Sequence, residues 1–299
     1  MRSSVVSRLL PPELAATVAA AVGAPLERLE PRGGSFGAQL LRITAGGRQF
    51  ALKWAAGGQA AAMLAAEAHG LRSLAASGAI RVPAVLLAQD GLAAKPAAVL
   101  SEWLEGGGAG PDQAALGEAL AALHRHTAPA YGLERDNFIG GTPQVNGWCD
   151  DWVTFFRERR LLPQIALAAS AGLLPVARQR ALERVVARLA DLLGGVPRAP
   201  ALIHGDLWGG NVVAAPGGGA ALIDPAISYS DREAELAFTE LFGGFTSRFY
   251  AAYNAAWPLE PGYAERRGLY NLYHLLNHLN LFGEGYGPQV DAIARRYGG

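Results

Sequence analysis

The stretch LIHGDLWGGNVV, residues 202–213, places one histidine, one aspartate and one asparagine among glycines, between two apolar ends. The apolar ends predict two short strands, and the polar residues between them predict a loop. Glycines at 205, 209 and 210 remove side-chain bulk, as a loop that passes close to a ligand requires. We expect His204 to pack beneath this loop and to hydrogen-bond its backbone.

Asp206 and Asn211 are five residues apart in this loop, and a third oxygen-bearing residue follows on the next hairpin. Phosphoryl transfer from ATP needs a carboxylate that accepts the proton of the attacking hydroxyl, and oxygen ligands that hold Mg²⁺. Kinase-type enzymes carry the base and a metal-binding Asn on one loop with this spacing. Asp224 ends the run AALID after the turn at 217–219. The pattern therefore predicts Asp206 as the base, with Asn211 and Asp224 as Mg²⁺ ligands.

The N-terminal third carries further groups that such a reaction needs. Two apolar runs joined by a Gly-Gly turn predict a hairpin, and a glycine corner that includes Gly33 and Gly34 precedes it. Backbone N–H groups at such a corner can cover phosphates. Lys53 closes the second run, FALKW, where a lysine can pair α- and β-phosphates. Glu67 lies inside the predicted helix 59–76 and can orient that lysine.

Each of these features is weak by itself. A glycine corner is most often a plain turn, a strand lysine is most often solvated, and a helix glutamate usually lies on the surface. Their order along the chain carries the prediction, because every feature falls on a suitable element and in the sequence that a phosphotransferase requires.

The segment SEWL lies directly before EGGGAG, the best candidate linker in the chain. We expect this segment to form a hinge whose backbone groups, at Glu102, Trp103 and Leu104, bind adenine. Strands before the linker and mostly helices after it predict an α+β, bilobal arrangement. Residues 1–105 would form a small β-rich ATP-binding lobe, and residues 106–299 a larger, mostly helical lobe for catalysis and substrate binding.

Composition narrows the class of partner. The chain has 26 basic and 26 acidic residues, and this zero formal charge argues against nucleic acid or a membrane surface. Its single cysteine excludes an internal disulfide and fits a reducing compartment, so we expect a cytoplasmic monomer. No run reaches the ~18 apolar residues of a membrane span. The stretch LAATVAAAVGA predicts an amphipathic helix in preference to a signal peptide.

The motifs resemble those of the fructosamine/ketosamine kinase family, relatives of the aminoglycoside and choline kinases within the protein-kinase-like fold. HGDLWGGN resembles the family's catalytic loop, and IDPAISYSDREAELAFTELFGGF resembles its metal-binding Asp and the helix after it. TPQVNGWCDDWVTFFRERRL and WPLEPGYAERRGLYNLYHLLNHLNLFGEGY are the more specific stretches, because many phosphotransferases share the HGD triplet. The likeness covers nearly the whole chain.

This resemblance implies ATP-dependent phosphorylation of the 3-hydroxyl of a fructosamine or ribulosamine, carried by a small molecule or by a glycated protein. The product releases its amine, so the implied role is repair of glycated amines. Asp206 would accept the proton, Asn211 and Asp224 would hold Mg²⁺, and Lys53 would contact the ATP phosphates and pair with Glu67. The loop GGSFG lacks the cysteine of some members, so their redox-sensitive dimerisation is not implied.

The substrate residues are less closely specified. Trp208 follows the base and can stack on the sugar face, and Asp231 follows the metal-binding Asp and can border the site. His274, Asn277 and Asn280 fall on one stripe of a predicted helix. They are candidates for substrate contact, although a polar ladder between packed helices explains the same spacing.

Two other functions compete with this interpretation. The first is another small-molecule kinase, acting on an aminoglycoside, choline or homoserine, although the chain has no long acidic run to suit a polycation. The second is a pseudokinase that binds nucleotide without turnover. The presence of Lys53, Asp206, Asn211 and Asp224 argues against it.

Overall fold

The protein forms two compact units, and each is described by itself. The first unit comprises Met1–Pro111 with Val213–Pro225, and the second comprises Asp112–Val212 with Ala226–Gly299. The expected boundary between residues 105 and 106 lies outside the described residues. The computed structural model describes residues 9–91, 95–104, 110–215 and 219–299.

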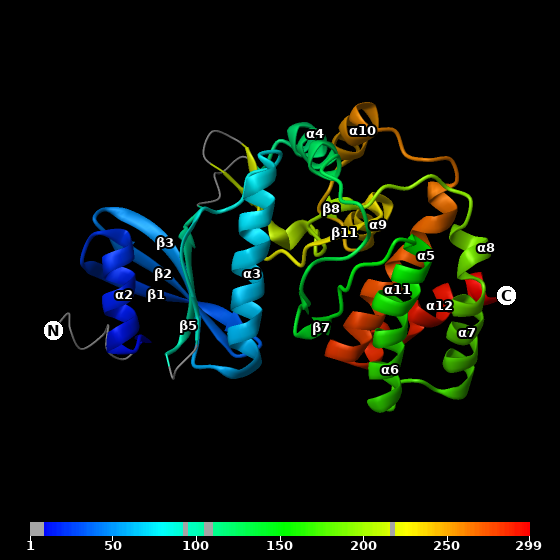
Figure 1. Ribbon diagram of the computed structural model, residues 1–299, viewed down its shortest axis with the longest axis horizontal. Helices are drawn as coiled ribbons and strands as arrows, with labels where there is room; N and C mark the ends of the chain where they lie inside the picture. Colours follow the sequence, from blue (N-terminus) through cyan, green and yellow to red (C-terminus); the bar gives the residue numbers. More distant parts are fainter. Residues whose placement is uncertain (1–8, 92–94, 105–109, 216–218) are drawn as a thin grey trace. The chain divides into compact units, whose positions relative to one another are not determined.

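A five-stranded antiparallel sheet forms the centre of the first unit (Figure 1). Its order is β1–β2–β3–β5–β4. Gly46 and Gly47 join β2 to β3 with φ of 56° and 69°, which is the conformation that a two-residue hairpin turn requires. This confirms the predicted Gly-Gly hairpin. The strands are β1 (Leu26–Ser35), β2 (Ala38–Ala45), β3 (Arg48–Ala55), β4 (Val85–Asp90) and β5 (Ala97–Glu102).

One helix covers each face of this sheet (Figure 1). Helix α2 (Pro12–Val22) packs on the face that carries Leu52, and α3 (Gly58–Ser77) packs on the face that carries Val99. Side chains alternate along a strand, so Lys53 projects to the α3 side. The predicted amphipathic first helix and the helix predicted over residues 59–76 are both confirmed.

A short insert from the middle of the chain belongs to the first unit. It contains the hairpin of β9 (Val212–Ala214) and β10 (Ala220–Leu222). The Leu222 N–H donates to Arg81 O at 2.9 Å, which holds this hairpin to the segment before β4. Most of the predicted turn at 217–219 lies outside the described residues.

The second unit is mostly helical and is built around α11 (Tyr263–Phe282), which packs against α6, α9 and α12. A second pair, α4 and α10, packs where Gly117 allows close approach, since a Cβ there would lie 2.3 Å from Phe249 O. Apart from the segment 152–161, which is described next, the other helices of the unit are α4 (Gln113–His124), α6 (Leu162–Ser170), α7 (Val176–Ala187), α8 (Leu189–Leu193), α9 (Arg232–Leu241), α10 (Ser247–Ala256) and α12 (Gly287–Gly298). Two 3₁₀ turns, η2 (Gly209–Asn211) and η3 (Glu284–Tyr286), also belong to it.

A π-helical segment interrupts one long helix. Helix α5 (Trp152–Phe155) continues as the π-helix η1 (Phe156–Leu161), which then enters α6. Pro163 lies at the start of α6 and has no N–H to donate back along the helix. The guanidinium of Arg160 donates to Arg159 O at 3.0 Å and so satisfies a carbonyl in this stretch.

Two small sheets complete the second unit. Strand β8 (Ala201–Ile203) pairs with β11 (Ser228–Ser230), and β6 (Asn137–Ile139) pairs with β7 (Thr142–Gln144). The short strands β8, β9 and β10 were expected, because each lies in an apolar run beside a turn. The equally short β6, β7 and β11 contain polar residues or proline and have no such apolar run, so the sequence did not reveal them. The predicted α+β class is confirmed. Within the described ranges no helix has the length and hydropathy to cross a bilayer.

Candidate functional site

Lys53 lies between two carboxylates of the first unit. Its Nζ is 2.8 Å from Glu67 Oε1 on α3 and 2.5 Å from Asp224 Oδ1 after β10. Burial by itself favours the neutral amine, but the two carboxylates outweigh it and raise the pKa of Lys53 above its ordinary value. Burial raises the pKa of Glu67, and the charge of Lys53 opposes that shift. Lys53 is therefore a cation at neutral pH, held by partners 14 and 171 positions away.

Asp224 has an unusual backbone conformation. Its φ is +56°, in the left-handed region that few residues other than glycine adopt. The next residue, Pro225, lies against α3 at Gly70, where a Cβ would be 2.9 Å from Pro225 Cγ. Strained backbone of this kind persists only where its surroundings require it, and it is concentrated at functional sites. The close contact at Gly70 and the ion pair with Lys53 together hold Asp224 in place.

The glycine corner forms the end of the β1–β2 hairpin. Gly33 pairs with Leu40 and Gly34 with Gln39, and both glycines are exposed. A Cβ on Gly34 would lie 2.2 Å from Ala38 O, so only glycine fits the tight crossing there. The hairpin thus presents glycine backbone at its tip, as a phosphate-covering loop would.

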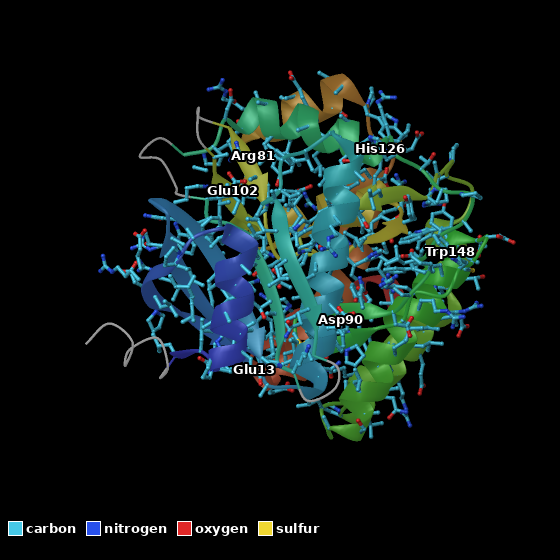
Figure 2. The ribbon with its side chains drawn as sticks, turned by 60° about the vertical axis from the view of Figure 1, so that its left-hand side comes forward. Glu13, Arg81, Asp90, Glu102, His126 and Trp148 are labelled. Atoms are coloured by element: carbon cyan, nitrogen blue, oxygen red, sulfur yellow. The ribbon has the colours of Figure 1, made fainter. Side chains whose placement is uncertain are left out.

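The predicted hinge begins at the end of β5. The Glu102 carboxylate pairs with Arg81 at 2.7 Å, and both side chains lie at the surface (Figure 2). The N–H groups of Glu102 and Trp103 donate to Ala84 O and Gln49 O. A backbone donor for adenine from this segment would therefore have to come from Leu104. The Trp103 ring is covered by the guanidinium groups of two arginines, 32 and 42, at 5.9 and 5.6 Å.

Asp206 and Asn211 contact each other in the second unit. Asn211 Nδ2 donates to Asp206 Oδ2 at 3.1 Å and to Asp206 O at 2.8 Å, so a single amide holds both the side chain and the backbone of the aspartate. The segment from Asp206 to Asn211 therefore forms a loop that ends in the 3₁₀ turn η2, and the contact between these two residues closes it. The predicted base is thus restrained before any substrate binds, which is the condition for efficient proton transfer.

His204 lies beneath the loop, as predicted. It is completely buried, and its Nδ1 accepts from the Asp206 N–H at 3.3 Å. Because Nδ1 is an acceptor here, a neutral His204 ring carries its proton on Nε2. His204 therefore supports the backbone of Asp206, and its own position is fixed by burial in the core.

Glu235 on α9 is the main support of the loop, and the sequence did not reveal it. Its side chain is fully buried, and it accepts from the backbone N–H groups of Gly205 at 2.6 Å and His204 at 3.1 Å. His124 Nε2 lies 3.0 Å from the same carboxylate, and His124 Nδ1 contacts Tyr253 OH at 2.8 Å. Burial opposes the charge, but these donors prevail and lower the pKa of Glu235.

The loop glycines make room for neighbouring protein. Gly205 has φ +84°, and a Cβ there would lie 2.0 Å from Ala226 O. A Cβ on Gly209 would lie 3.1 Å from Gly244 Cα, and one on Gly210 would lie 2.2 Å from the Trp208 ring. We expected glycine here because of a nearby ligand, and the structure adds a reason internal to the fold. The Trp208 ring covers its own loop and stays 42% exposed, so it remains accessible to a substrate.

Both carboxylate oxygens of Asp231 accept hydrogen bonds from within the second unit. It caps α9 by accepting from the Glu233 N–H at 2.9 Å, and its second oxygen accepts from Arg198 at 2.6 Å and Tyr270 OH at 2.5 Å. The side chain is only 4% exposed. These contacts occupy both carboxylate oxygens, so Asp231 is not part of the substrate site that we propose below.

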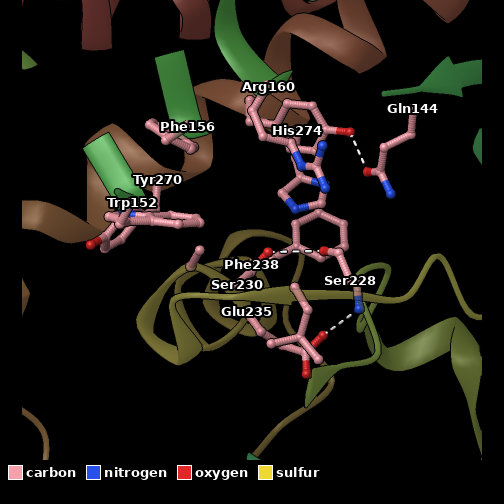
Figure 3. Close-up of a pocket in the computed structure, with 14 residues that line it drawn as sticks. Gln144, Trp152, Phe156, Arg160, Ser228, Ser230, Glu235, Phe238, Tyr270 and His274 are labelled. Carbon is pink, nitrogen blue, oxygen red and sulfur yellow. Dashed lines mark hydrogen bonds between the residues drawn. The ribbon is translucent and has the colours of Figure 1, made fainter. Parts of the chain in front are cut away.

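His274 lines a pocket in the interior of the second unit (Figure 3). The cavity measures about 30 Å³, enough for a single water. The His274 ring stacks on Phe238 at 3.6 Å, its Nδ1 has no hydrogen-bond partner, and burial lowers its pKa well below the ordinary value. Gly205 and Glu235 line the same pocket, so His274 faces the rear of the catalytic loop.

Asn277 and Asn280, which share a helix stripe with His274, form the polar ladder between packed helices that was the alternative to substrate contact. Asn280 Nδ2 donates to Gln164 Oε1 at 2.7 Å, and Asn277 lies 3.4 Å from Gln164 Nε2. The stripe therefore joins α11 to α6 through Asn277 and Asn280.

The oxygen donors at two predicted positions suit Mg²⁺, which prefers carboxylate and carbonyl oxygens and completes its shell with water and substrate phosphates. Asn211 uses its Nδ2 on Asp206, so Oδ1 is the amide atom that a cation would take. Asp224 is 46% exposed and so is accessible to a cation. No group of three His, Cys, Asp or Glu gathers in the described part of the chain.

Comparison with known proteins identifies similar sequences. A family model described as fructosamine kinase matches residues 14–297. A protein of Synechocystis sp. named a probable ketoamine kinase is 45% identical over 237 residues, covering 78% of each chain. The chloroplastic protein-ribulosamine 3-kinase of Arabidopsis thaliana is 37% identical over 238 residues, covering 79% of this chain and 72% of that protein.

Solved structures show the same fold. A crystal structure from Thermobifida fusca, provisionally named a fructosamine-3-kinase, has a TM-score of 0.86 at 34% identity and covers 94% of this chain and 97% of its own. An aminoglycoside phosphotransferase in complex with ADP and hygromycin B has a TM-score of 0.64 at 16% identity, covering 96% and 99% of the two chains. The second likeness concerns the fold alone, and it confirms the predicted kinase-like architecture.

Proposed function

Because the chain belongs to the fructosamine kinase family, we propose that it transfers the γ-phosphoryl group of ATP to the 3-hydroxyl of a ketosamine. The acceptor would be a fructosamine or a ribulosamine, either as a small molecule or on a glycated protein. Relatives named ketoamine kinase and protein-ribulosamine 3-kinase support this acceptor class. The role would be the repair of glycated amines, because phosphorylation at this position leads to release of the amine.

The observation that carries the proposal is the position of Lys53 Nζ, 2.8 Å from Glu67 and 2.5 Å from Asp224. A strand lysine oriented by a helix glutamate next to a strand-end aspartate is the arrangement with which kinases hold ATP phosphates and their metal. Lys53 would neutralise charge on the phosphates. Glycine backbone at Gly33 and Gly34 would cover them.

Asp206 would act on the acceptor. The oxygen of the 3-hydroxyl attacks the γ-phosphorus, a new O–P bond forms, and the bond from that phosphorus to the β,γ-bridging oxygen breaks. ADP leaves with the bonding electrons, and the hydroxyl proton passes to the Asp206 carboxylate. Asn211 holds this carboxylate through its Nδ2, and His204 supports the backbone beneath it. The transition state is loose, so positioning contributes more than basicity.

Asn211 Oδ1 and Asp224 would hold Mg²⁺, which supplies charge neutralisation to the phosphates when bound. In this structure Lys53 Nζ donates a hydrogen bond to Asp224 Oδ1. We propose that the lysine and the metal-binding aspartate exchange partners when nucleotide enters, since both groups then find opposite charges on the ligand.

The two rival functions have less support. An aminoglycoside phosphotransferase shares the fold at only 16% identity, whereas ketoamine kinases reach 45%. A pseudokinase would not need an Asp206 carboxylate that is held by Asn211, on a loop whose backbone is held by Glu235.

An ADP-release assay with Mg-ATP tests the proposal. Fructosyl-lysine, ribulosyl-lysine, choline and kanamycin are offered in parallel, and we expect turnover with the ketosamines alone. Asp206→Asn should lower kcat by about 10²–10⁴-fold, the contribution of a positioned general base, with little change in ATP affinity or Tm. Turnover of kanamycin or choline only, or near-full activity of Asp206→Asn, would refute the assignment.

A further inference from the structure

An aromatic surface made of Phe242, His278, Phe282 and Tyr286 lies on the second unit. The His278 ring is at its centre, with ring centroids 4.8 Å from Phe242, 5.5 Å from Phe282 and 5.0 Å from Tyr286. Phe242 is 38% exposed and Phe282 is 61% exposed, so the cluster is open to solvent. Three exposed or half-buried rings around one imidazole are costly to leave uncovered, and such patches mark ligand or partner sites.

The proton position of His278 is set by its backbone contact. Its Nδ1 lies 2.8 Å from His274 O, and a carbonyl can only accept, so Nδ1 carries the hydrogen. Burial lowers the pKa of His278, which keeps the ring neutral at pH 7. Nε2 is then a hydrogen-bond acceptor at the centre of the aromatic surface.

The aromatic surface is continuous with the catalytic loop in two ways. Gly244, two residues after Phe242, lies against Gly209 of the loop. Phe242 also contacts Phe238 at 5.7 Å, and Phe238 lines the pocket behind Gly205. A substrate whose hydroxyl reaches Asp206 would therefore extend toward Phe242.

The nearby carboxylate of Glu284 is already paired within the fold. Glu284 lies between Phe282 and Tyr286 in sequence, but its two oxygens accept from the buried Arg178 at 2.7 and 2.9 Å. Arg178 also binds Asp291, so it anchors η3 to α7 and α12. A cation at the aromatic surface would be recognised by ring faces and an imidazole acceptor.

Building on the proposed function, we propose that this aromatic surface binds the protonated amine of the ketosamine and the first carbons of the group that it carries. The nitrogen is a secondary ammonium, which has both N–H donors and a positive charge. Ring faces of Phe242, Phe282 and Tyr286 attract the charge, and His278 Nε2 accepts one N–H. The surface would thus distinguish glycated amines from ordinary ketoses.

The test compares an amine with its ether. N-propyl fructosamine and 1-O-propyl fructose differ in one atom, and only the first is a cation. We expect wild type to prefer the amine in kcat/KM. Phe282→Ala should lower the amine-to-ether ratio about 5-fold, which corresponds to a cation–π contact of roughly 1 kcal/mol. Phe282→Tyr should keep the ratio, and His278→Phe should lower it while the rings stay.

Trp148→Ala is the matched control, because Trp148 is an exposed ring of the same unit, 47% exposed, that pairs with a different residue, Tyr229. It should leave the ratio unchanged, and Tm confirms that all variants are folded. An unchanged ratio in both Phe282→Ala and His278→Phe, with full turnover in wild type, would overturn the inference and leave the proposed function standing. No turnover of the amine by wild type would overturn the proposed function itself.

Discussion

Replacing Glu235 with glutamine tests whether this buried carboxylate holds the catalytic loop. The carboxylate accepts three hydrogen bonds, from Gly205 N, His204 N and His124 Nε2, in a site with no solvent exposure. An amide keeps one acceptor oxygen and turns an NH₂ group toward the other donors. One buried N–H left unpaired costs about 1–3 kcal/mol, and the loss of charge assistance adds about 1 kcal/mol. We therefore expect Glu235→Gln to lose about 2–4 kcal/mol.

Calorimetry and steady-state kinetics measure the two consequences of Glu235→Gln. At an unfolding entropy of about 2.1 cal/mol/K per residue, this loss corresponds to a fall in Tm of about 3–6 °C for a chain of 299 residues. Below that Tm, kcat should fall with little change in KM for ATP, because the displaced N–H groups belong to the residues next to Asp206. Glu240→Gln is the control on the same helix. Glu240 pairs with Arg267, which is 47% exposed, and accepts from Tyr263 OH at 2.6 Å. Because the amide oxygen of glutamine can still accept from Tyr263, the effect should be about 1 kcal/mol at most, below that of Glu235→Gln.

The pH dependence of stability gives a second measurement on the same variant. The folded protein lowers the pKa of Glu235 below its ordinary 4.5. Its stabilising contribution is then fully present above that pH and is lost as the pH falls through the folded-state pKa. The difference in unfolding free energy between wild type and Glu235→Gln should shrink on acidification below about pH 4.5. Equal Tm and kcat in the two proteins at pH 7 would refute the assigned role.

Two further substitutions test other parts of the site. Lys53→Met should lower kcat/KM for ATP by about 10–100-fold through loss of a charged contact, and affect ketosamine affinity less; equal losses for both substrates in steady-state kinetics would contradict the phosphate role. Gly205→Ala should destabilise more than Gly172→Ala in thermal unfolding. Both have positive φ, 84° and 71°, but a Cβ meets Ala226 O at 2.0 Å only at Gly205, so equal Tm shifts would show that the contact is not restrictive.

Local pattern was sufficient for much of the fold. The Gly46–Gly47 turn, the helix that ends at Gly78 and the side of the sheet reached by Lys53 all follow from turn chemistry or from alternation along a strand. Trp152 and Phe155, two aromatic residues of the run WVTFF, are buried, as the hydrophobicity of their side chains favours. These features depend on neighbours within a few residues, so the sequence contains the necessary information.

The candidate site was partly predictable. The order of motifs led to Lys53, Glu67, Asp206, Asn211 and Asp224, and the structure brings Lys53 to Glu67 and Asp224, and Asn211 to Asp206. The roles of these residues in catalysis stay predictions until the kinetics are measured. The support from Glu235 was missed, because an acidic residue in an amphipathic helix has no local feature that reveals its burial.

By itself, the sequence determined the element types, the turns and the residues that carry chemistry, since each of these depends on spacing along the chain. Only the tertiary structure decided which polar groups are hydrogen-bonded within the protein and which remain available for a ligand. From the sequence, Asp231 was a candidate to border the substrate site, yet in the structure it is satisfied by Arg198 and Tyr270 from distant elements. A hydrogen bond between residues 30 or more positions apart depends on how helices and strands pack, and no local pattern records it.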